Sequence, residues 1–92
     1  MSEHLPMDEL LEQRRKLARQ LKVGDRYQHY KNRHFYRIHS LALREEDDSW
    51  SVNYADEISG VIFNRRVEVF LAKVLGENGE MVSRFKKVKE GK

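Results

Sequence analysis

The sequence predicts a mainly β fold, in which about five short antiparallel strands form a small barrel or strongly bent sheet after one amphipathic α-helix. Two observations predict it. Apolar residues recur at helical spacing in the first 24 residues, and beyond them apolar and polar residues alternate with a period of two. Turn-forming clusters separate the alternating segments, as in antiparallel sheets. The length of 92 residues suits a single domain, which we assign to residues 1–92.

The first predicted element is a helix over residues 6–22. Pro6 suits a first helical turn, and Gly24 is a natural stop after the last one. The apolar stripe of this helix consists of Met7, Leu10, Leu11, Leu17, Ala18 and Leu21, and Arg14 interrupts it. Such a stripe can pack either on the rest of its own chain or on the helix of a second copy, so we expect a monomer or a homodimer joined through this helix. We favour packing within the chain.

The strands are predicted by the alternating segments that follow. They cover residues 26–31, 34–44, 50–55, 60–71 and 81–88, with a break in the fourth near 64–66. The Asn78-Gly79 pair predicts a tight hairpin before the last strand. We therefore expect a β-barrel over residues 23–88 with Trp50 and Phe70 in its core, followed by a basic tail over 89–92.

Composition excludes several classes of protein. The chain has no cysteine, so disulfide frameworks, thiolate nucleophiles and cysteine-based zinc sites are excluded. No apolar run approaches the roughly 18 residues that a membrane span needs, and the acidic N-terminus is not typical of a signal peptide. We therefore expect a cytoplasmic protein that makes no membrane contact.

The sequence offers no positive sign of catalysis. His29, His34 and His39 are spaced five residues apart, which matches no usual spacing of metal ligands. The serines lack a Gly-x-Ser-x-Gly elbow, and the chain has no glycine-rich phosphate loop. We therefore assign no catalytic residue and expect neither a metal nor a cofactor.

Charge is distributed unevenly along the chain, although the net charge is only +3. Residues 22–44 carry six basic side chains and one acidic one, residues 45–60 carry six acidic and no basic ones, and residues 86–92 carry four basic and one acidic. If the two basic segments share a face, their cations and interleaved tyrosines would suit phosphates and stacked bases. This alternative function, nucleic-acid binding, would use Arg26, Lys31, Arg33, Arg37, Lys86 and Lys87.

A run of residues near the first strand resembles a known family. It is Gly24-Asp-Arg-Tyr-Gln-His-Tyr-Lys31, and it is followed by Tyr36, Ala42, Val52-Asn-Tyr54, Arg65, Gly79 and Arg84-Phe85. In these residues the chain resembles a small bacterial and phage family, domain of unknown function family 1653, over about residues 22–88. The resemblance implies an SH3-like barrel. The chain departs from the family pattern at Phe63-Asn-Arg-Arg66, where Trp-Val-Arg-Pro is usual, and at Arg44, where a histidine is usual.

The resemblance also implies a ligand site, made of His29, Tyr30, Lys31, Tyr54 and Arg65. Tyr30 and Tyr54 could equally fill the barrel, but charged side chains are seldom buried without partners. We therefore expect Lys31 and Arg65 to contact an anionic or peptide ligand and His29 to donate a hydrogen bond to it. The predicted function is a non-catalytic binding module that recognises a protein partner or an anionic ligand in a polar and aromatic groove at the first strand.

Overall fold

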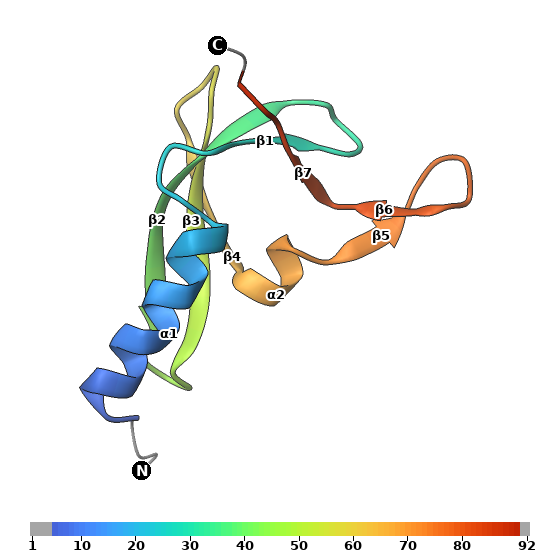
Figure 1. The fold of residues 1–92 in the computed structure, drawn as a ribbon. Helices are drawn as coiled ribbons and strands as arrows, with labels where there is room; N and C mark the ends of the chain where they lie inside the picture. Colours follow the sequence, from blue (N-terminus) through green and yellow to red (C-terminus); the bar gives the residue numbers. More distant parts are fainter. Residues whose placement is uncertain (1–4, 91–92) are drawn as a thin grey trace.

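The computed structural model describes residues 5–90, which form two helices and seven strands (Figure 1). In chain order the elements are α1 (Met7–Gln20), β1 (Arg26–His29), β2 (Phe35–Arg44), β3 (Ser49–Asp56), β4 (Ile62–Arg66), α2 (Val67–Phe70), β5 (Lys73–Leu75), β6 (Met81–Ser83) and β7 (Phe85–Lys87). The predicted N-terminal helix and the first three predicted strands are therefore confirmed, with shifts of a few residues at their ends. Of the predicted basic tail, residues 91–92 lie outside the described part of the chain.

Five of the strands form one antiparallel sheet in the order β4-β3-β2-β1-β7. The first part of β2 pairs with β1, nearly all of β2 pairs with β3, and a bulge lies between Ile38 and Ser40. β4 and β7 are the two edges and do not pair with each other. The predicted mainly β fold is confirmed, and the described strands form an open, bent sheet with no closed barrel.

The predicted fourth strand is wrong in its second half. β4 ends at Arg66, and the chain continues as one turn of helix, α2. The alternation of Val67 and Val69 predicted a strand here, but the helical turn places Val67 and Phe70, three residues apart, in the core together. Burying the larger Phe70 ring through a turn of helix thus outweighs the local preference of valine for strands.

The predicted last strand is divided at Arg84 into two short strands, β6 and β7. The Arg84 backbone N–H donates to the Ala72 carbonyl at 3.0 Å, and the Arg84 carbonyl accepts from the Tyr30 N–H at 3.0 Å. At this residue the chain therefore passes from the small hairpin into the main sheet.

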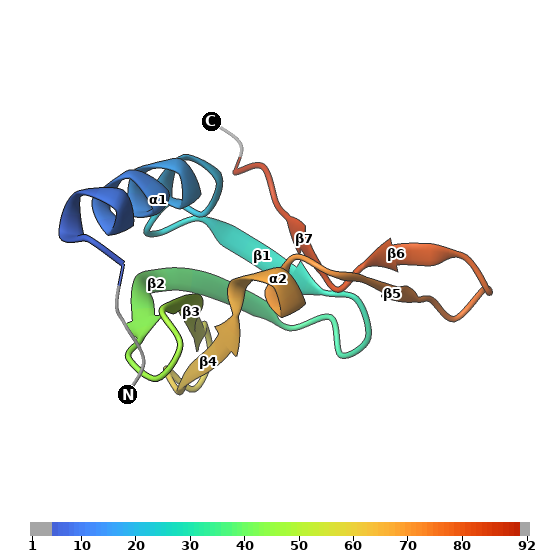
Figure 2. The same ribbon diagram turned by 90° about the horizontal axis from the view of Figure 1, so that it is seen from below.

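The hairpin predicted at Asn78-Gly79 is confirmed as the β5–β6 pair. Gly79 has a φ of +86°, a left-handed conformation that a glycine adopts without steric cost. Figure 2 shows this hairpin extending away from the main sheet, beyond the turn that joins β1 to β2. It therefore forms one wall of a concave surface beside β1.

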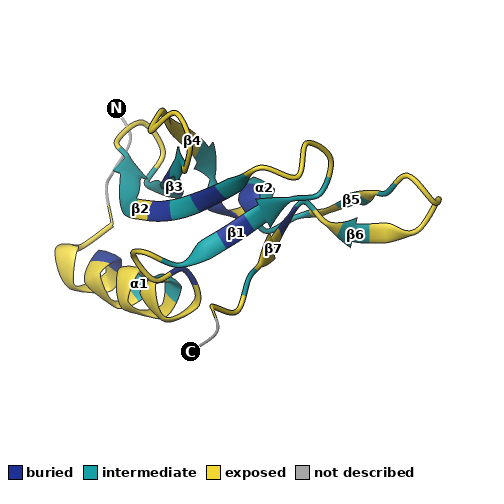
Figure 3. Ribbon diagram, turned by 90° about the horizontal axis from the view of Figure 1, so that it is seen from above, coloured by how far each residue is buried: buried dark blue, intermediate teal, exposed yellow. Residues whose placement is uncertain are grey.

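The core lies where β1, β2, β3 and α2 meet, and Figure 3 shows the buried segments gathered there. Its buried members are Leu21, Tyr27, Tyr36, Ile38, Val52, Tyr54, Val67, Phe70 and Phe85. Phe70 is fully buried, as predicted, and its ring stacks on Phe85 with 4.2 Å between ring centroids. Trp50 is only partly buried and packs against the margin of this core.

Helix α1 packs on the sheet of its own chain through part of its stripe. Leu10 and Leu21 are buried, and Leu17 packs against the core. The Trp50 indole Nε1–H donates to Gln13 Oε1 at 2.9 Å, which fastens the middle of the helix to β3. Leu11 remains 40% exposed, so the stripe is incompletely covered. Within residues 5–90, neither helix has the length and apolar character to cross a membrane.

Candidate functional site

A groove of about 620 Å³ lies between the end of β1 and the β5–β6 hairpin. Its walls come from β1 and the following turn on one side, and from the hairpin and β7 on the other. The lining residues are Gln28, His29, Tyr30, Arg33, Lys73, Gly76, Glu77, Asn78, Met81, Val82, Ser83 and Lys86. A volume of this size is in the range of small-molecule and peptide side-chain sites.

The groove is lined by three cations and one acid. Arg33 comes from the turn after β1, Lys73 from β5 and Lys86 from β7, while Glu77 is at the tip of the hairpin. None of the three cations makes an ion pair with another described residue. The groove therefore has a net positive charge that the described part of the chain leaves uncompensated.

The turn that carries Arg33 is held in a fixed shape. The Gln28 side-chain amide donates to the Arg33 carbonyl at 3.1 Å, and the Arg33 N–H donates to the His29 carbonyl at 3.1 Å. Arg33 has a φ of +65°, in the left-handed region that favours glycine or asparagine. An arginine here is therefore strained, and its conformation is imposed by the surrounding turn.

His29 ends β1 with its imidazole partly buried. Its Nδ1 accepts hydrogen bonds from the backbone N–H groups of Lys31, at 3.1 Å, and Asn32, at 3.4 Å. An Nδ1 that accepts requires the proton of the neutral ring to be on Nε2. Burial, then the charges of Arg65, Arg84 and Lys31 and lastly His34, lower the pKa of His29, so the neutral ring is favoured.

Of the five residues predicted to bind ligand, His29 and Tyr30 line the groove. Lys31 is exposed on the turn, because β1 ends at His29 and the strand predicted as far as residue 31 is too long. Tyr54 is 3% exposed and is a core residue. Arg65 lies against it, with its Nε donating to the Tyr54 hydroxyl at 3.1 Å. The structure thus separates the five into two groove residues, a turn residue, and the buried Tyr54 with the partly exposed Arg65 against it.

Lys73 and Glu77 were missed at the sequence level as groove residues. Lys73 begins β5, which is only three residues long and follows a turn of helix, so the alternation that would mark the strand is too short to recognise. Glu77 lies in the loop after that strand. The Asn78-Gly79 hairpin signal would have located both, because it fixes which residues flank the turn. Lys86 and Arg33 were singled out only for nucleic-acid binding.

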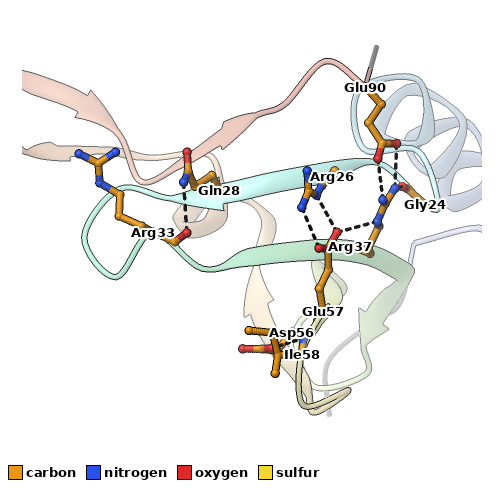
Figure 4. A network of polar contacts seen from close by, with 9 residues as sticks. All are labelled: Gly24, Arg26, Gln28, Arg33, Arg37, Asp56, Glu57, Ile58 and Glu90. Atoms are coloured by element: carbon orange, nitrogen blue, oxygen red, sulfur yellow. Dashed lines mark hydrogen bonds and ion pairs between the residues drawn. The ribbon is translucent and has the colours of Figure 1, made fainter. Parts of the chain in front are cut away.

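Half of the predicted basic patch is neutralised by acidic side chains, and Figure 4 shows this for Arg26 and Arg37. Arg26 donates to both carboxylate oxygens of Glu57, at 2.7 and 2.9 Å. Arg37 donates to Glu57 at 2.9 Å and to Glu90 at 2.6 and 2.8 Å. The hydrogen bond from Arg26 is the main cause that lowers the pKa of Glu57, and the one from Arg37 lowers the pKa of Glu90.

Lys87, another residue of that predicted patch, lies 3.3 Å from Asp25. Three of the six predicted nucleic-acid contacts, Arg26, Arg37 and Lys87, are therefore paired with acids. Lys31, Arg33 and Lys86 have no ion pair within the described residues. Glu57 belongs to the acidic segment 45–60, so basic and acidic side chains from separate segments of the sequence neutralise each other in the fold.

The histidines do not come together as ligands. His34 Nδ1 lies 3.6 Å from Asp56, while His39 Nδ1 contacts the Ser40 hydroxyl at 2.9 Å. Across residues 5–90 no three histidine or acidic side chains are arranged to hold a metal ion. Apart from Glu77, the charged side chains that line the groove are cations, which are suited to holding an anion in place.

Comparison with known families identifies the chain. Residues 25–87 match the model of the family described as a protein of unknown function (DUF1653). The chain belongs to the DUF1653 family. The match begins after α1, so it covers the β sheet, the hairpin and the whole groove, while the helix lies outside the DUF1653 region. No curated protein and no solved structure gave a match.

Proposed function

We propose that this DUF1653 protein is a non-catalytic binding module that takes an acidic peptide segment of a protein partner in the groove between β1 and the β5–β6 hairpin. The observation that carries the proposal is a set of three cations without an ion pair in the described part of the chain, Arg33, Lys73 and Lys86, which come from three separate segments and line one groove. Like charges placed together repel one another, and an anionic ligand relieves that repulsion.

The remaining lining favours a peptide over a small inorganic anion. Met81 and Val82 supply apolar contact area on the hairpin, and Tyr30 supplies an aromatic ring with a polar end. Gln28 and Ser83 add polar groups that can hydrogen-bond to a peptide backbone. A peptide with alternating acidic and apolar side chains would use both kinds of contact.

The strained turn supports the same interpretation. Arg33 keeps a left-handed conformation that costs about 1 kcal/mol or more for a residue with a side chain. A glycine or asparagine at this position would relieve the strain but would remove a cation from the groove. Retaining arginine there is consistent with a role for its guanidinium in binding.

Nucleic-acid binding stays the alternative, and the fold weakens its basis. It would depend on a continuous basic surface, but Arg26 and Arg37 are each held by Glu57, and Arg37 by Glu90 as well. The free cations Lys31, Arg33 and Lys86 surround the end of β1, a smaller footprint than the predicted patch. We also propose that the open sheet is related to the SH3-like barrel. Such a fold would suit either peptide binding or nucleic-acid binding.

The test is a selection of random peptides displayed against the full chain, followed by affinity measurement of the enriched sequences by calorimetry. We expect enrichment of Asp and Glu and an affinity that falls as salt is raised. The double substitution Lys73→Gln and Lys86→Gln should weaken binding about tenfold or more, since charge-assisted contacts contribute about 1.5–3 kcal/mol each. The double substitution Lys22→Gln and Lys89→Gln is the matched control, because both are exposed lysines outside the groove and the same number of charges is removed.

Two outcomes would contradict the proposal. One is a selection that yields no acidic preference. The other is an equal loss of affinity in the control with Lys22→Gln and Lys89→Gln, which would show a general charge effect. Salt-dependent binding of mixed oligonucleotides, with no peptide binding, would instead favour the nucleic-acid alternative.

A further inference from the structure

Arg65, Arg84 and His29 gather around one part of the aromatic core. His29 pairs with Phe85, the residue after Arg84, and the two rings meet edge-on with 5.0 Å between centroids. The Phe85 ring lies 5.2 Å from the Tyr54 ring, whose hydroxyl accepts the hydrogen bond from Arg65. Arg65 thus contacts one ring of the Tyr54–Phe85 pair, Arg84 directly precedes the other in the chain, and both charges act on His29.

Neither arginine is neutralised by the protein. Within residues 5–90, neither Arg65 nor Arg84 forms an ion pair. The Nε–H of Arg84 is buried and has no hydrogen-bond partner. The Nε–H of Arg65 is bonded only to a neutral hydroxyl. A buried donor on a charged group is costly to leave without an acceptor, so this arrangement lacks an anion.

His29 adds a donor of fixed direction. Because its Nδ1 accepts from the Lys31 and Asn32 backbone, its proton is on Nε2. No described residue accepts a hydrogen bond from that Nε2. The ring also lines the groove, and the charges of Arg65 and Arg84 both act on it.

We propose that His29, Arg65 and Arg84 form an anchor that holds one oxyanion, a carboxylate or a phosphate, of the bound segment. The two guanidinium groups donate charge-assisted hydrogen bonds to it, and the His29 Nε2–H donates a third bond. The anchor rests on the proposed function only in assigning the oxyanion to the peptide in the groove. Because a small free oxyanion can occupy the anchor alone, the two proposals can be tested separately.

The first experiment follows the full chain, labelled with ¹⁵N, by NMR during titration with sodium phosphate or sodium acetate at constant ionic strength. We expect saturable shifts of the Arg84 Nε–H signal and of the His29 ring. We also expect the pKa of His29 to rise on binding, because an anion favours the imidazolium and opposes the charges of Arg65, Arg84, Lys31 and His34.

Variants then assign the anchor. Arg84→Gln and Arg65→Gln should each weaken phosphate binding about tenfold, the effect of losing one charge-assisted contact. Arg19→Gln is the matched control, because it removes an exposed arginine of α1 that lies outside both the groove and the anchor. Backbone amide spectra of all three variants establish that the fold is retained. No saturable shift, or wild-type affinity in both folded anchor variants, would overturn the proposal.

Peptides separate the sources of the oxyanion and the two proposals. Acidic peptides are compared with a free C-terminus, with an amidated C-terminus and with one phosphoserine, and the Arg84 Nε–H signal reports occupancy of the anchor. The peptide that shifts this signal most carries the oxyanion that the anchor binds. Phosphate binding without any peptide binding would contradict the groove proposal and support the anchor. Peptide binding that never shifts Arg84 or His29 would overturn the anchor and leave the groove proposal standing.

Discussion

Phe70 is the side chain on which the core depends most. It is fully buried, stacks on Phe85 and lies 5.2 Å from the Tyr27 ring and 5.1 Å from the Tyr54 ring, between centroids. Phe70→Ala should therefore lower the free energy of unfolding by about 3–5 kcal/mol. Trp50→Ala should lower it less, by about 1–3 kcal/mol, because the indole is only partly buried.

Urea denaturation of the two variants measures both losses on the same scale. The sequence assigned both rings to the core and so expected similar costs. Equal losses of unfolding free energy would mean that Trp50 contributes more to stability than its packing at the edge of the core and its hydrogen bond to Gln13 explain.

The functional residues could be predicted only in part, for a reason visible at His29. Alternation within an extended strand placed His29 and Lys31 on one side, but the chain turns directly after His29. Because of that turn, the Lys31 side chain does not lie beside His29 on the strand. Instead, the Lys31 backbone N–H donates to His29 Nδ1. Turn geometry that depends on contacts with Arg84 and the next strand is not encoded in local alternation.

At the scale of elements, helix α1 should stabilise the sheet through its last turns. Leu21, just after the helix, is 1% exposed, whereas Leu11 is 40% exposed. Leu21→Ala should lower the free energy of unfolding by about 2–5 kcal/mol. Leu11→Ala is the matched control and should cost less than about 1 kcal/mol, since most surface substitutions have small effects.

Thermal and urea unfolding of both variants test this difference. A similar small loss in both would mean that the helix contributes little to the folded sheet and would favour a role as a partner-binding arm. A large loss in Leu11→Ala would point instead to burial of that side chain in a homodimer, which dilution of the sample would then reveal.

Element types were predicted where the signal was local and missed where it was not. The Asn78-Gly79 pair predicted the hairpin correctly because these two residues by themselves favour the tight turn that joins its strands. The one-turn helix at Val67–Phe70 has no capping residue and a valine-rich sequence, so only packing around Phe70 selects it. Whether a sheet closes into a barrel likewise depends on contacts between residues far apart in the sequence, and the number of predicted strands alone does not determine it.

At the scale of the whole molecule, folding changes the meaning of the charge pattern. The basic segment 22–44 and the acidic segment 45–60 meet through Arg26, Arg37 and Glu57, and Glu90 from the end of the described chain joins them. Arg66 is paired in the same way with Asp47, at 3.1 Å. Within residues 5–90, positive charge without an ion pair remains at the groove, on Arg33, Lys73 and Lys86, and also along α1, on Arg14, Lys16 and Arg19.

This compensation predicts how nucleic-acid binding could be introduced. The combined substitution Glu57→Gln and Glu90→Gln frees Arg26 and Arg37 on one face and raises the net charge by two. We expect oligonucleotide affinity to increase, most at low salt, because phosphate contacts depend on free cations. The urea midpoint should fall, because bidentate arginine–carboxylate pairs joined in a network stabilise a fold more than isolated exposed pairs do.

Fluorescence anisotropy with a labelled oligonucleotide at two salt concentrations measures the effect. The matched control is Glu45→Gln with Glu68→Gln, which raises the net charge equally but removes two exposed acids that form no ion pair within residues 5–90. A larger gain from freeing Arg26 and Arg37 would show that the Glu57–Glu90 network masks a local basic surface. An equal gain in both variants would contradict this, because net charge alone would then account for the affinity.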